Sequence, residues 1–215
     1  MKLRTAVFAS GGGSNFQALL DHQSPTGSWR VALLVTDRED AGAGVRARAA
    51  GVDVAVVAPG ARDPRDSGRE LLAVLDDHRI DLVLLAGYLK LVPREVVERY
   101  EGRMLNIHPA LLPKFGGKGM YGMRVHRAVL DAGETESGAT VHLVDEEYDR
   151  GAIVAQRRVP VLEGDTPEAL AARVLAVEHR LYPAAVDHVC DALAAGEEPG
   201  RMPEERAASD VASRG

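Results

Sequence analysis

Short apolar runs alternate with stretches of helical periodicity along the first half of the chain. The runs are rich in Val, Leu and Ile and almost uninterrupted, which is typical of strands buried on both faces of a parallel sheet. They cover residues 5–9, 31–36, 53–57, 81–86 and 104–108. The helical stretches between them cover residues 15–22, 43–50, 68–79 and 93–100. This alternation predicts an α/β fold with a doubly wound, mostly parallel sheet and right-handed crossovers.

The second half of the chain has a different pattern. Prolines and glycines interrupt residues 109–122, which are therefore expected to form a loop. A short helix over 125–132 precedes two more strongly alternating runs, 139–144 and 153–161, which are expected as added edge strands.

A long C-terminal helix is predicted next, from Thr166 to about Ala195, with Thr166 as its N-cap and Pro167 in its first position. Pro183 is expected to kink or interrupt this helix. Residues 1–195 are expected to form a single domain. Residues 196–215 have almost no large apolar side chains and are expected to be a disordered acidic tail.

Composition narrows the class of protein. The chain has 215 residues, of which 46% are hydrophobic and 27% charged, as in an ordinary soluble domain. Its single cysteine, Cys190, excludes a disulfide framework and a thiolate metal cage. A net charge of −6 argues against a broad nucleic-acid surface, and no apolar run approaches the ~20 residues that cross a bilayer. We therefore expect a cytoplasmic monomer or homodimer that acts on small molecules.

The first candidate site is the turn S-G-G-G-S-N at residues 10–15, which joins the first strand to the first helix. Backbone N–H groups and the positive end of a helix dipole can hold an anion such as phosphate at such a turn. The turn lacks the third glycine of G-x-G-x-x-G, because Asn15 and Phe16 stand in that region, and it lacks the GK[ST] of a P-loop. A single phosphate is one interpretation, and a plain turn capped by Ser14 or Asn15 is the other.

The second candidate is the end of the fifth strand, where Asn106 and His108 share one face because strand side chains alternate. An amide donor beside a titratable imidazole suits stabilisation of an oxyanion and movement of a proton, although His108 could simply cap the strand. The turn D-E-E-Y-D-R-G at residues 145–151 adds carboxylates, and nothing local selects one of them over a solvated surface. No histidine or acidic spacing matches a metal motif, so no metal is expected.

Four segments together resemble a known family: S-G-G-G-S-N, L-N-I-H-P-A-L-L-P-K-F, G-A-T-V-H-L-V-D-E-E-Y-D-R-G and V-E-H-R-L-Y-P. In this order and spacing, from about residue 3 to about residue 189, the chain is similar to the phosphoribosylglycinamide formyltransferases among the folate-dependent formyltransferases. The resemblance implies a Rossmann-like sheet. It also implies transfer of a formyl group from the co-substrate 10-formyltetrahydrofolate to glycinamide ribonucleotide, in purine synthesis.

The resemblance also implies roles for individual residues. The catalytic set would be Asn106, His108 and Asp149. The ribonucleotide would be bound by Gly13, Ser14 and Asn15 at its phosphate and by Glu178 near its ribose. The folate would be bound by Arg65 (or Arg62), Leu89, Lys90, Leu91, Val92, Asn106, Asp145, Glu146, Glu147 and Tyr148.

Two features of the loop after the fifth strand also follow from the comparison with the family. A cis bond at Leu112–Pro113 is implied by the resemblance. The loop from Phe115 to Gly122 departs from the family by looking longer than usual, so its conformation is not implied.

The expected chemistry is direct attack of a primary amine on the formyl carbon, with Asn106 and a protonated His108 stabilising the oxyanion. A carboxylate such as Asp149 would raise the pKa of His108. Formylation of methionyl-tRNA is a rival that would call for a basic C-terminal domain, whereas only an acidic tail of about 20 residues follows the last helix. A non-catalytic nucleotide-binding module is a second rival, which leaves Asn106, His108 and Asp149 unexplained.

Overall fold

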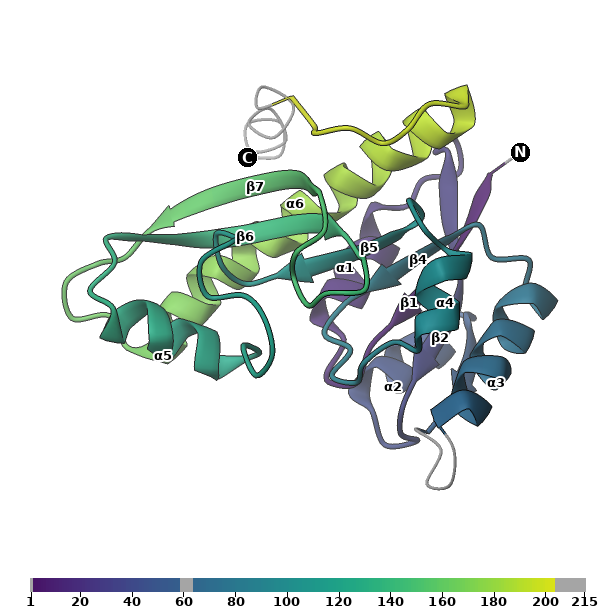
Figure 1. Ribbon diagram of the computed structural model, residues 1–215, viewed down its shortest axis with the longest axis horizontal. Coiled ribbons are helices and arrows are strands. Elements are labelled where there is room, and N and C mark those ends of the chain that lie inside the picture. The colour runs from purple at the N-terminus through teal and green to yellow at the C-terminus, as the bar shows by residue number, and fades with distance from the viewer. Residues whose placement is uncertain (1, 59–63, 204–215) are drawn as a thin grey trace. The chain divides into compact units, whose positions relative to one another are not determined.

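The computed structural model describes residues 2–58 and 64–203 (Figure 1). The chain divides into two compact units, Met1–Asn106 and Ile107–Gly215. The single domain expected over residues 1–195 stays a prediction. The predicted α/β class is confirmed, because the strands of the first unit are parallel and alternate with helices along the chain.

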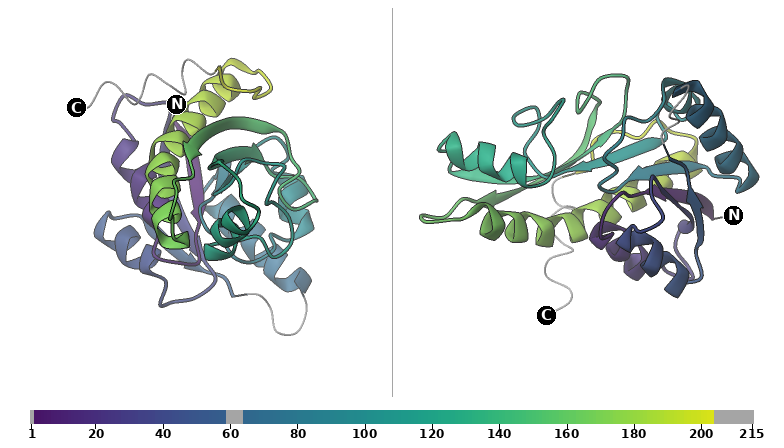
Figure 2. Two further views of the ribbon diagram at one scale, coloured as in Figure 1. Left: turned by 90° about the vertical axis from the view of Figure 1, so that its left-hand side faces the viewer. Right: turned by 90° about the horizontal axis from the view of Figure 1, so that it is seen from below.

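The first unit holds a parallel sheet in the order β3-β2-β1-β4-β5. Helices α1 and α2 cover one face of this sheet and helices α3 and α4 the other (Figures 1 and 2), as right-handed crossovers require. The elements are β1 (Leu3–Phe8), α1 (Ser14–His22), β2 (Trp29–Thr36), α2 (Gly42–Ala49), β3 (Asp53–Val56), α3 (Pro64–Asp77), β4 (Leu82–Leu85), α4 (Arg94–Arg99) and β5 (Met104–His108).

The continuous apolar runs form the core of this unit. Leu33 and Leu34 on β2 are both fully buried although they point to opposite faces, and Val83 and Leu84 on β4 repeat this pattern. Burial on both faces is why these strands read as unbroken aliphatic runs rather than as alternating ones. The carboxyl ends of β1, β2 and β4 then project loops at one edge, which is where open α/β sheets bind ligands.

The second unit contains an antiparallel strand pair and a long helix. Helix α6 packs against both strands and against α5 (Figure 2). The elements are α5 (Met123–Asp131), β6 (Glu136–Leu143), β7 (Ile153–Pro160) and α6 (Pro167–Ala195). The predicted edge strands and the long C-terminal helix are thereby confirmed.

Helix α6 begins and ends as expected, at Pro167 and Ala195. The hydroxyl of Thr166 accepts a hydrogen bond from Ala169 N at 3.2 Å, which is the predicted N-cap. The helix is not interrupted at Pro183, in contrast to the sequence-based expectation. Leu181, Tyr182 and Ala185 around this proline are buried, so packing of the helix face outweighs the hydrogen bond that proline cannot donate.

The segment after α6 is ordered where the composition predicted disorder. Met202 is 3% exposed, and its N–H donates to Val154 O on β7 at 2.7 Å. His188 Nε2 donates to Gly200 O at 3.0 Å. One buried methionine and two backbone partners therefore fix residues 197–203, while the remainder of the expected tail, residues 204–215, lies outside the described residues.

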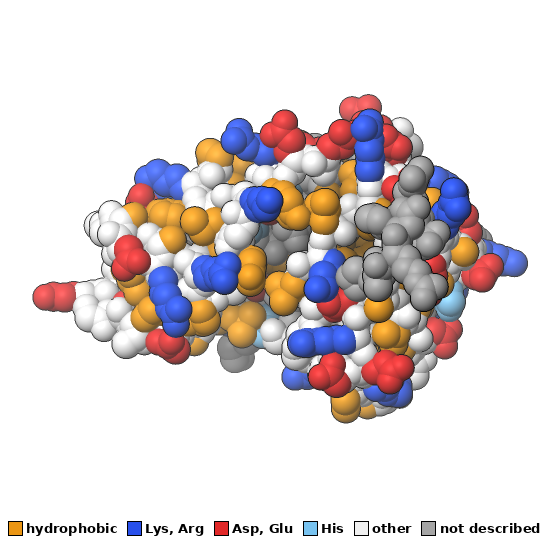
Figure 3. Space-filling model, turned by 60° about the horizontal axis from the view of Figure 1, so that its bottom comes forward, with side chains coloured by type: hydrophobic (Ala, Val, Ile, Leu, Met, Phe, Trp, Pro, Cys, Tyr) orange, Lys and Arg blue, Asp and Glu red, His pale blue; other side chains and the backbone are white. Residues whose placement is uncertain are grey.

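The surface carries charges of both signs. Lys and Arg side chains are scattered among Asp and Glu on the face drawn in Figure 3, with no single basic patch there. Among the described residues, no helix is long and apolar enough to cross a membrane.

Candidate active site

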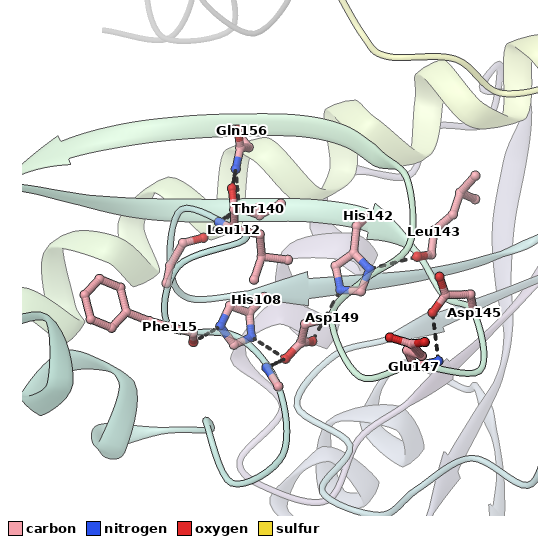
Figure 4. A network of polar contacts seen from close by, with 12 residues as sticks. His108, Leu112, Phe115, Thr140, His142, Leu143, Asp145, Glu147, Asp149 and Gln156 are labelled. Carbon is pink, nitrogen blue, oxygen red and sulfur yellow. Dashed lines mark hydrogen bonds and ion pairs between the residues drawn. The ribbon is translucent and has the colours of Figure 1, made fainter.

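A buried polar cluster in the second unit gathers two histidines around one carboxylate (Figure 4). His108 lies at the end of β5, His142 lies on β6, and Asp149 lies in the turn that joins β6 to β7. His108 Nδ1 is 3.6 Å from Asp149 Oδ2, and His142 Nε2 is 3.5 Å from Asp149 Oδ1. The two imidazoles are 4% and 2% exposed and the carboxylate is 11% exposed, so all three side chains are shielded from bulk water.

The other ring nitrogen of each histidine is hydrogen-bonded to a backbone carbonyl. His108 Nε2 contacts Phe115 O at 2.8 Å, and His142 Nδ1 contacts Leu143 O at 2.8 Å. A carbonyl oxygen only accepts, so both of these nitrogens donate. In the neutral His108 ring, the nitrogen that faces Asp149 is then the basic one. A proton added to His108 Nδ1 is therefore stabilised by the Asp149 carboxylate.

Burial and nearby charges shift the pKa values of His108 and Asp149 in opposite directions. Burial lowers the pKa of His108 below its ordinary value, and the nearby Asp149 carboxylate offsets only part of this effect. Asp149 therefore acts on the His108 pKa in the expected direction, but burial has the larger effect and the net shift is downward. Burial would raise the pKa of Asp149, but hydrogen bonding from His142, the charge of His108 and the Gly117 N–H together hold that pKa below its ordinary value. Asp149 thus stays ionised at neutral pH.

The glycine-rich loop after β5 closes against Asp149. Gly117 N donates to Asp149 Oδ2 at 2.8 Å. A Cβ on Gly116 would lie 2.5 Å from Leu112 Cδ2 and 3.1 Å from Asp149 Cβ, so a larger residue here would force Leu112 and Asp149 to move. Phe115 and Asp149 themselves both have φ of 56°, a left-handed conformation that is costly for residues other than glycine. The strained backbone at both positions coincides with the two groups that contact His108.

A second network of hydrogen bonds fixes the loop immediately after His108. Thr140 Oγ1 on β6 donates to Ala110 O at 2.6 Å and accepts from Leu112 N at 3.1 Å. Gln156 Nε2 on β7 donates to Leu112 O at 2.9 Å and to Thr140 Oγ1 at 3.0 Å (Figure 4). The bond between Leu112 and Pro113 is cis, as the resemblance implies. This network anchors the loop to the strand pair that carries His142.

Sequence reasoning missed four polar residues of this region: Thr140, His142, Gln156 and His126. The first two could have been found, because period two places Thr140 and His142 on one face of β6. His126 on α5 is 5% exposed, and its Nδ1 has no hydrogen-bond partner among the described residues. Burial, followed by the charge of His108, lowers the pKa of His126. Nothing in the local sequence distinguishes it from a surface histidine of an amphipathic helix.

The remaining expected site residues of the second unit differ in their exposure to solvent. Glu178 on α6 is 6% exposed. In the acidic turn, Asp145, Glu146, Glu147 and Tyr148 are exposed, and Asp145 Oδ1 accepts from Glu147 N at 2.9 Å. Asp149 is therefore the carboxylate of the turn that reaches His108.

In the first unit, the turn at residues 10–15 has the geometry of a helix start that is open to an anion. Gly13 is the N-cap of α1, with φ of 74°, and no side chain of the cap satisfies the first N–H groups. The alternative prediction, a helix capped by the side chain of Ser14 or Asn15, is thus not confirmed. Arg38 Nε donates to Ser10 O at 2.9 Å and Arg46 Nε donates to Gly12 O at 2.8 Å. These two guanidinium groups add positive charge beside the turn.

Replacing Gly13 by alanine is expected to lower the free energy of unfolding by about 2–5 kcal/mol, which corresponds to a Tm lower by roughly 5–15 °C. The new Cβ would lie 2.8 Å from both Cα and Cβ of Ala43, in a backbone conformation that L residues avoid. Thermal unfolding followed by circular dichroism measures this. Gly12→Ala is the matched control, because its Cβ would meet nothing within 4 Å. Equal melting temperatures for the two variants would contradict the prediction.

The segment after β4 presents apolar side chains to solvent. Leu89 and Leu91 are 56% and 64% exposed, whereas Val92 is buried. Lys90 Nζ lies 3.9 Å from Asp37 Oδ2, and this carboxylate is 8% exposed. Arg62 falls outside the described residues, and so does the side chain of Arg65.

Asn106, the remaining expected catalytic residue, ends the first unit. It is half-buried on β5 in register with Leu85 of β4, two residues before His108 on the same strand. Among the described residues, no group of three His, Cys, Asp or Glu side chains is arranged to hold a metal ion.

Comparisons with known proteins bear on the identity of this chain. Residues 3–186 match the family model described as formyl transferase. The chloroplastic phosphoribosylglycinamide formyltransferase of Arabidopsis thaliana is 51% identical over 191 residues, which cover 87% of this chain. This chain spans only 65% of that plant protein's length.

Two further relatives match along more of their length. The phosphoribosylglycinamide formyltransferase of Escherichia coli (strain K12) is 36% identical over 191 residues, or 88% of each chain. The crystal structure of glycinamide ribonucleotide transformylase 1 from Symbiobacterium toebii superposes with a TM-score of 0.82 at 41% identity, covering 88% of each chain. This agreement of sequence and Rossmann-like fold over most of the chain shows that the protein belongs to the formyl transferase family.

Proposed function

We propose that this protein transfers the formyl group of 10-formyltetrahydrofolate to the primary amine of glycinamide ribonucleotide, a step of purine synthesis. The observation that best supports this proposal is the pairing of buried His108 with Asp149 in a chain that matches the formyl transferase family over residues 3–186. Relatives from a plant and a bacterium named phosphoribosylglycinamide formyltransferase support the same substrate.

The reaction requires no covalent bond to the protein. The neutral amine attacks the formyl carbon, a C–N bond forms, and the formyl oxygen becomes an oxyanion. The bond from the formyl carbon to the folate nitrogen then breaks, and that nitrogen takes the proton that the attacking amine loses. An α-amino group with a pKa of roughly 8 supplies enough neutral nucleophile at cellular pH.

In this proposal Asn106 and His108 stabilise the oxyanion, and His108 Nε2 exchanges Phe115 O for the oxyanion when the substrates bind. Protonated His108 is a stronger donor than neutral His108, and a negative charge forming next to the ring favours its protonation just when the charge appears. Asp149 faces the basic nitrogen of His108 and stabilises the imidazolium. His108 or a water held by Asp149 carries the proton to the leaving nitrogen.

The ribonucleotide is assigned to the turn at residues 10–15 and to Glu178. The ribonucleotide phosphate binds Gly13, Ser14 and Asn15, supported by the N–H groups that no cap side chain occupies at the start of α1. Glu178 meets the ribose.

The folate is assigned to the segment after β4 and to the acidic turn. The exposed Leu89 and Leu91 offer apolar contacts to its ring system, with Lys90 and Val92 beside them. The turn residues Asp145, Glu146, Glu147 and Tyr148 contribute their backbone, together with Asn106 and Arg65.

The test is release of tetrahydrofolate from 10-formyltetrahydrofolate, followed spectroscopically with and without glycinamide ribonucleotide. We expect release only when the ribonucleotide is present. Glycinamide, which has the amine but no ribose phosphate, should be a much poorer acceptor. Release without any acceptor would indicate a hydrolase, release with methionyl-tRNA alone would indicate the tRNA-directed reaction, and tight ligand binding without release would indicate a non-catalytic binding module. Each of these three results contradicts the proposal.

Cytoplasmic localisation and a monomeric or homodimeric state stay predictions of the sequence. The name of the Arabidopsis relative places that protein in the chloroplast. Fractionation and sedimentation measurements address these two points separately from the catalytic proposal.

A further inference from the structure

Ser10 stands where two segments of the first unit meet. It lies two residues after the end of β1 and begins the turn at residues 10–15, and it is 1% exposed. Its backbone N–H donates to Gly87 O at 3.1 Å, and its Oγ accepts from Leu89 N at 3.0 Å. Its carbonyl oxygen accepts from Arg38 Nε at 2.9 Å. Two of the three polar groups of one serine are therefore bonded to the segment after β4.

That segment is held at its other positions by groups outside the turn. The ring of Tyr88 packs edge-on against Phe8 of β1, with 5.3 Å between the ring centroids. Lys90 pairs with Asp37, which follows β2. The exposed Leu89 is linked to the turn through its backbone N–H, which donates to the Ser10 hydroxyl.

The turn itself is anchored through its carbonyl groups. Gly11 O accepts from Ala43 N at 3.0 Å, and Gly12 O accepts from Arg46 Nε at 2.8 Å. An anion bound by N–H groups of the turn would restrain the peptide units that follow Ser10. Because Ser10 is bonded to residues 87 and 89, this restraint passes to the segment that carries Leu89. A segment that is already ordered loses less conformational entropy when a second ligand binds it.

We propose that Ser10 is a positioning residue that couples the binding of the two substrates, so that phosphate in the turn strengthens folate binding by the segment after β4. The coupling rests on the proposed function, which assigns the phosphate to the turn and the folate to residues 89–92. Thermodynamic linkage makes the effect reciprocal, and couplings of this kind change affinity about fivefold or more.

The test measures the Kd of tetrahydrofolate by calorimetry with and without saturating glycinamide ribonucleotide. This pair cannot react, because tetrahydrofolate carries no formyl group. We expect the ribonucleotide to lower the Kd about fivefold or more in the unmodified protein and less than about twofold in Ser10→Ala. The Kd of the ribonucleotide alone should change little in the variant. No coupling in the unmodified protein, or equal coupling in the variant, would overturn the inference, whereas failure to bind either ligand would contradict the proposed function instead.

Asp37→Asn is the matched control variant. It removes the charge that pairs with Lys90 in the same segment but leaves the Ser10 hydroxyl in place. We expect weaker tetrahydrofolate binding in this variant, but the ribonucleotide should still lower the Kd of tetrahydrofolate about fivefold or more. Loss of this effect would show that any disturbance of the segment abolishes coupling, and would overturn the assignment to Ser10.

Amide hydrogen exchange supplies a readout that does not depend on a variant. Adding glycinamide ribonucleotide to the unmodified protein should slow exchange in a peptide covering residues 87–91. Unchanged exchange there would overturn the inference even if Ser10→Ala failed to fold.

Discussion

Replacing His108 by alanine is expected to lower kcat for formyl transfer about 10³-fold, with a much smaller change in the KM for glycinamide ribonucleotide. The imidazole is 4% exposed and faces a carboxylate, so the charge it gains opposite an oxyanion acts in a site that bulk water does not screen. The imidazolium stabilises the oxyanion only as the negative charge develops in the transition state. The substitution should therefore lower kcat rather than raise KM. Steady-state release of tetrahydrofolate measures both constants.

Two variants separate chemistry from folding in this experiment. His108→Gln can still donate to Phe115 O through its amide but cannot titrate, so it should fold and remain nearly as inactive as the alanine variant. His188→Ala is the control, because half-buried His188 on α6 also donates to a backbone carbonyl through Nε2 but does not contact Asp149. His188→Ala should keep nearly full activity. Retention of most of the turnover by His108→Gln would disprove a titrating role for His108.

Replacing Asp149 by asparagine should lower kcat about 10²-fold or more and move the pKa of His108 further down. Burial already lowers the pKa of His108, and the charge of Asp149 is the largest effect that opposes burial. Without that charge the imidazolium is less stable, so the fraction of protonated His108 at a given pH falls tenfold for each unit of pKa. NMR titration of the imidazole resonances measures the shift directly.

Asparagine is the substitution that isolates the charge. Asp149 has φ of 56°, and asparagine tolerates this left-handed conformation better than most residues. Its amide oxygen can still accept from Gly117 N, so the loop should keep its position. The melting temperature should therefore change little. The role given to Asp149 fails if the variant turns over at the unmodified rate, or if the pKa of His108 stays where it was.

Most of the fold could be predicted because the apolar pattern depends directly on burial. Strands covered on both faces read as continuous aliphatic runs, and all of the predicted strands are present. Element ends were less predictable. Helix α3 begins at Pro64, four residues before the expected start, because its first turn, P-R-D-S, has no apolar periodicity although proline suits a first helical position. At Pro183 local propensity was outweighed by packing that only the folded chain provides.

The candidate site could be predicted only in part. The positions of Asn106 and His108 at a strand end follow from strand periodicity, but the partner carboxylate comes from a turn 41 residues further along, and the residues themselves did not select it. His142 reaches the same carboxylate because β6 and β7 are joined by that turn, which is a tertiary relation. The direction of the His108 pKa depends on how much water the folded chain removes, and no local pattern reports that quantity.

The ordered segment after α6 has a consequence for the outer side of β7. Strand β7 pairs with β6 along one side, and Val154 falls at the register shift opposite Val141 and His142. An uncovered strand side offers unpaired backbone groups to which another chain can add. The Val154 carbonyl is already bonded to Met202 N, and the methionine side chain is buried at 3% exposure. The C-terminal segment therefore occupies a place where a foreign strand could otherwise dock, at the strand that follows the turn carrying Asp149.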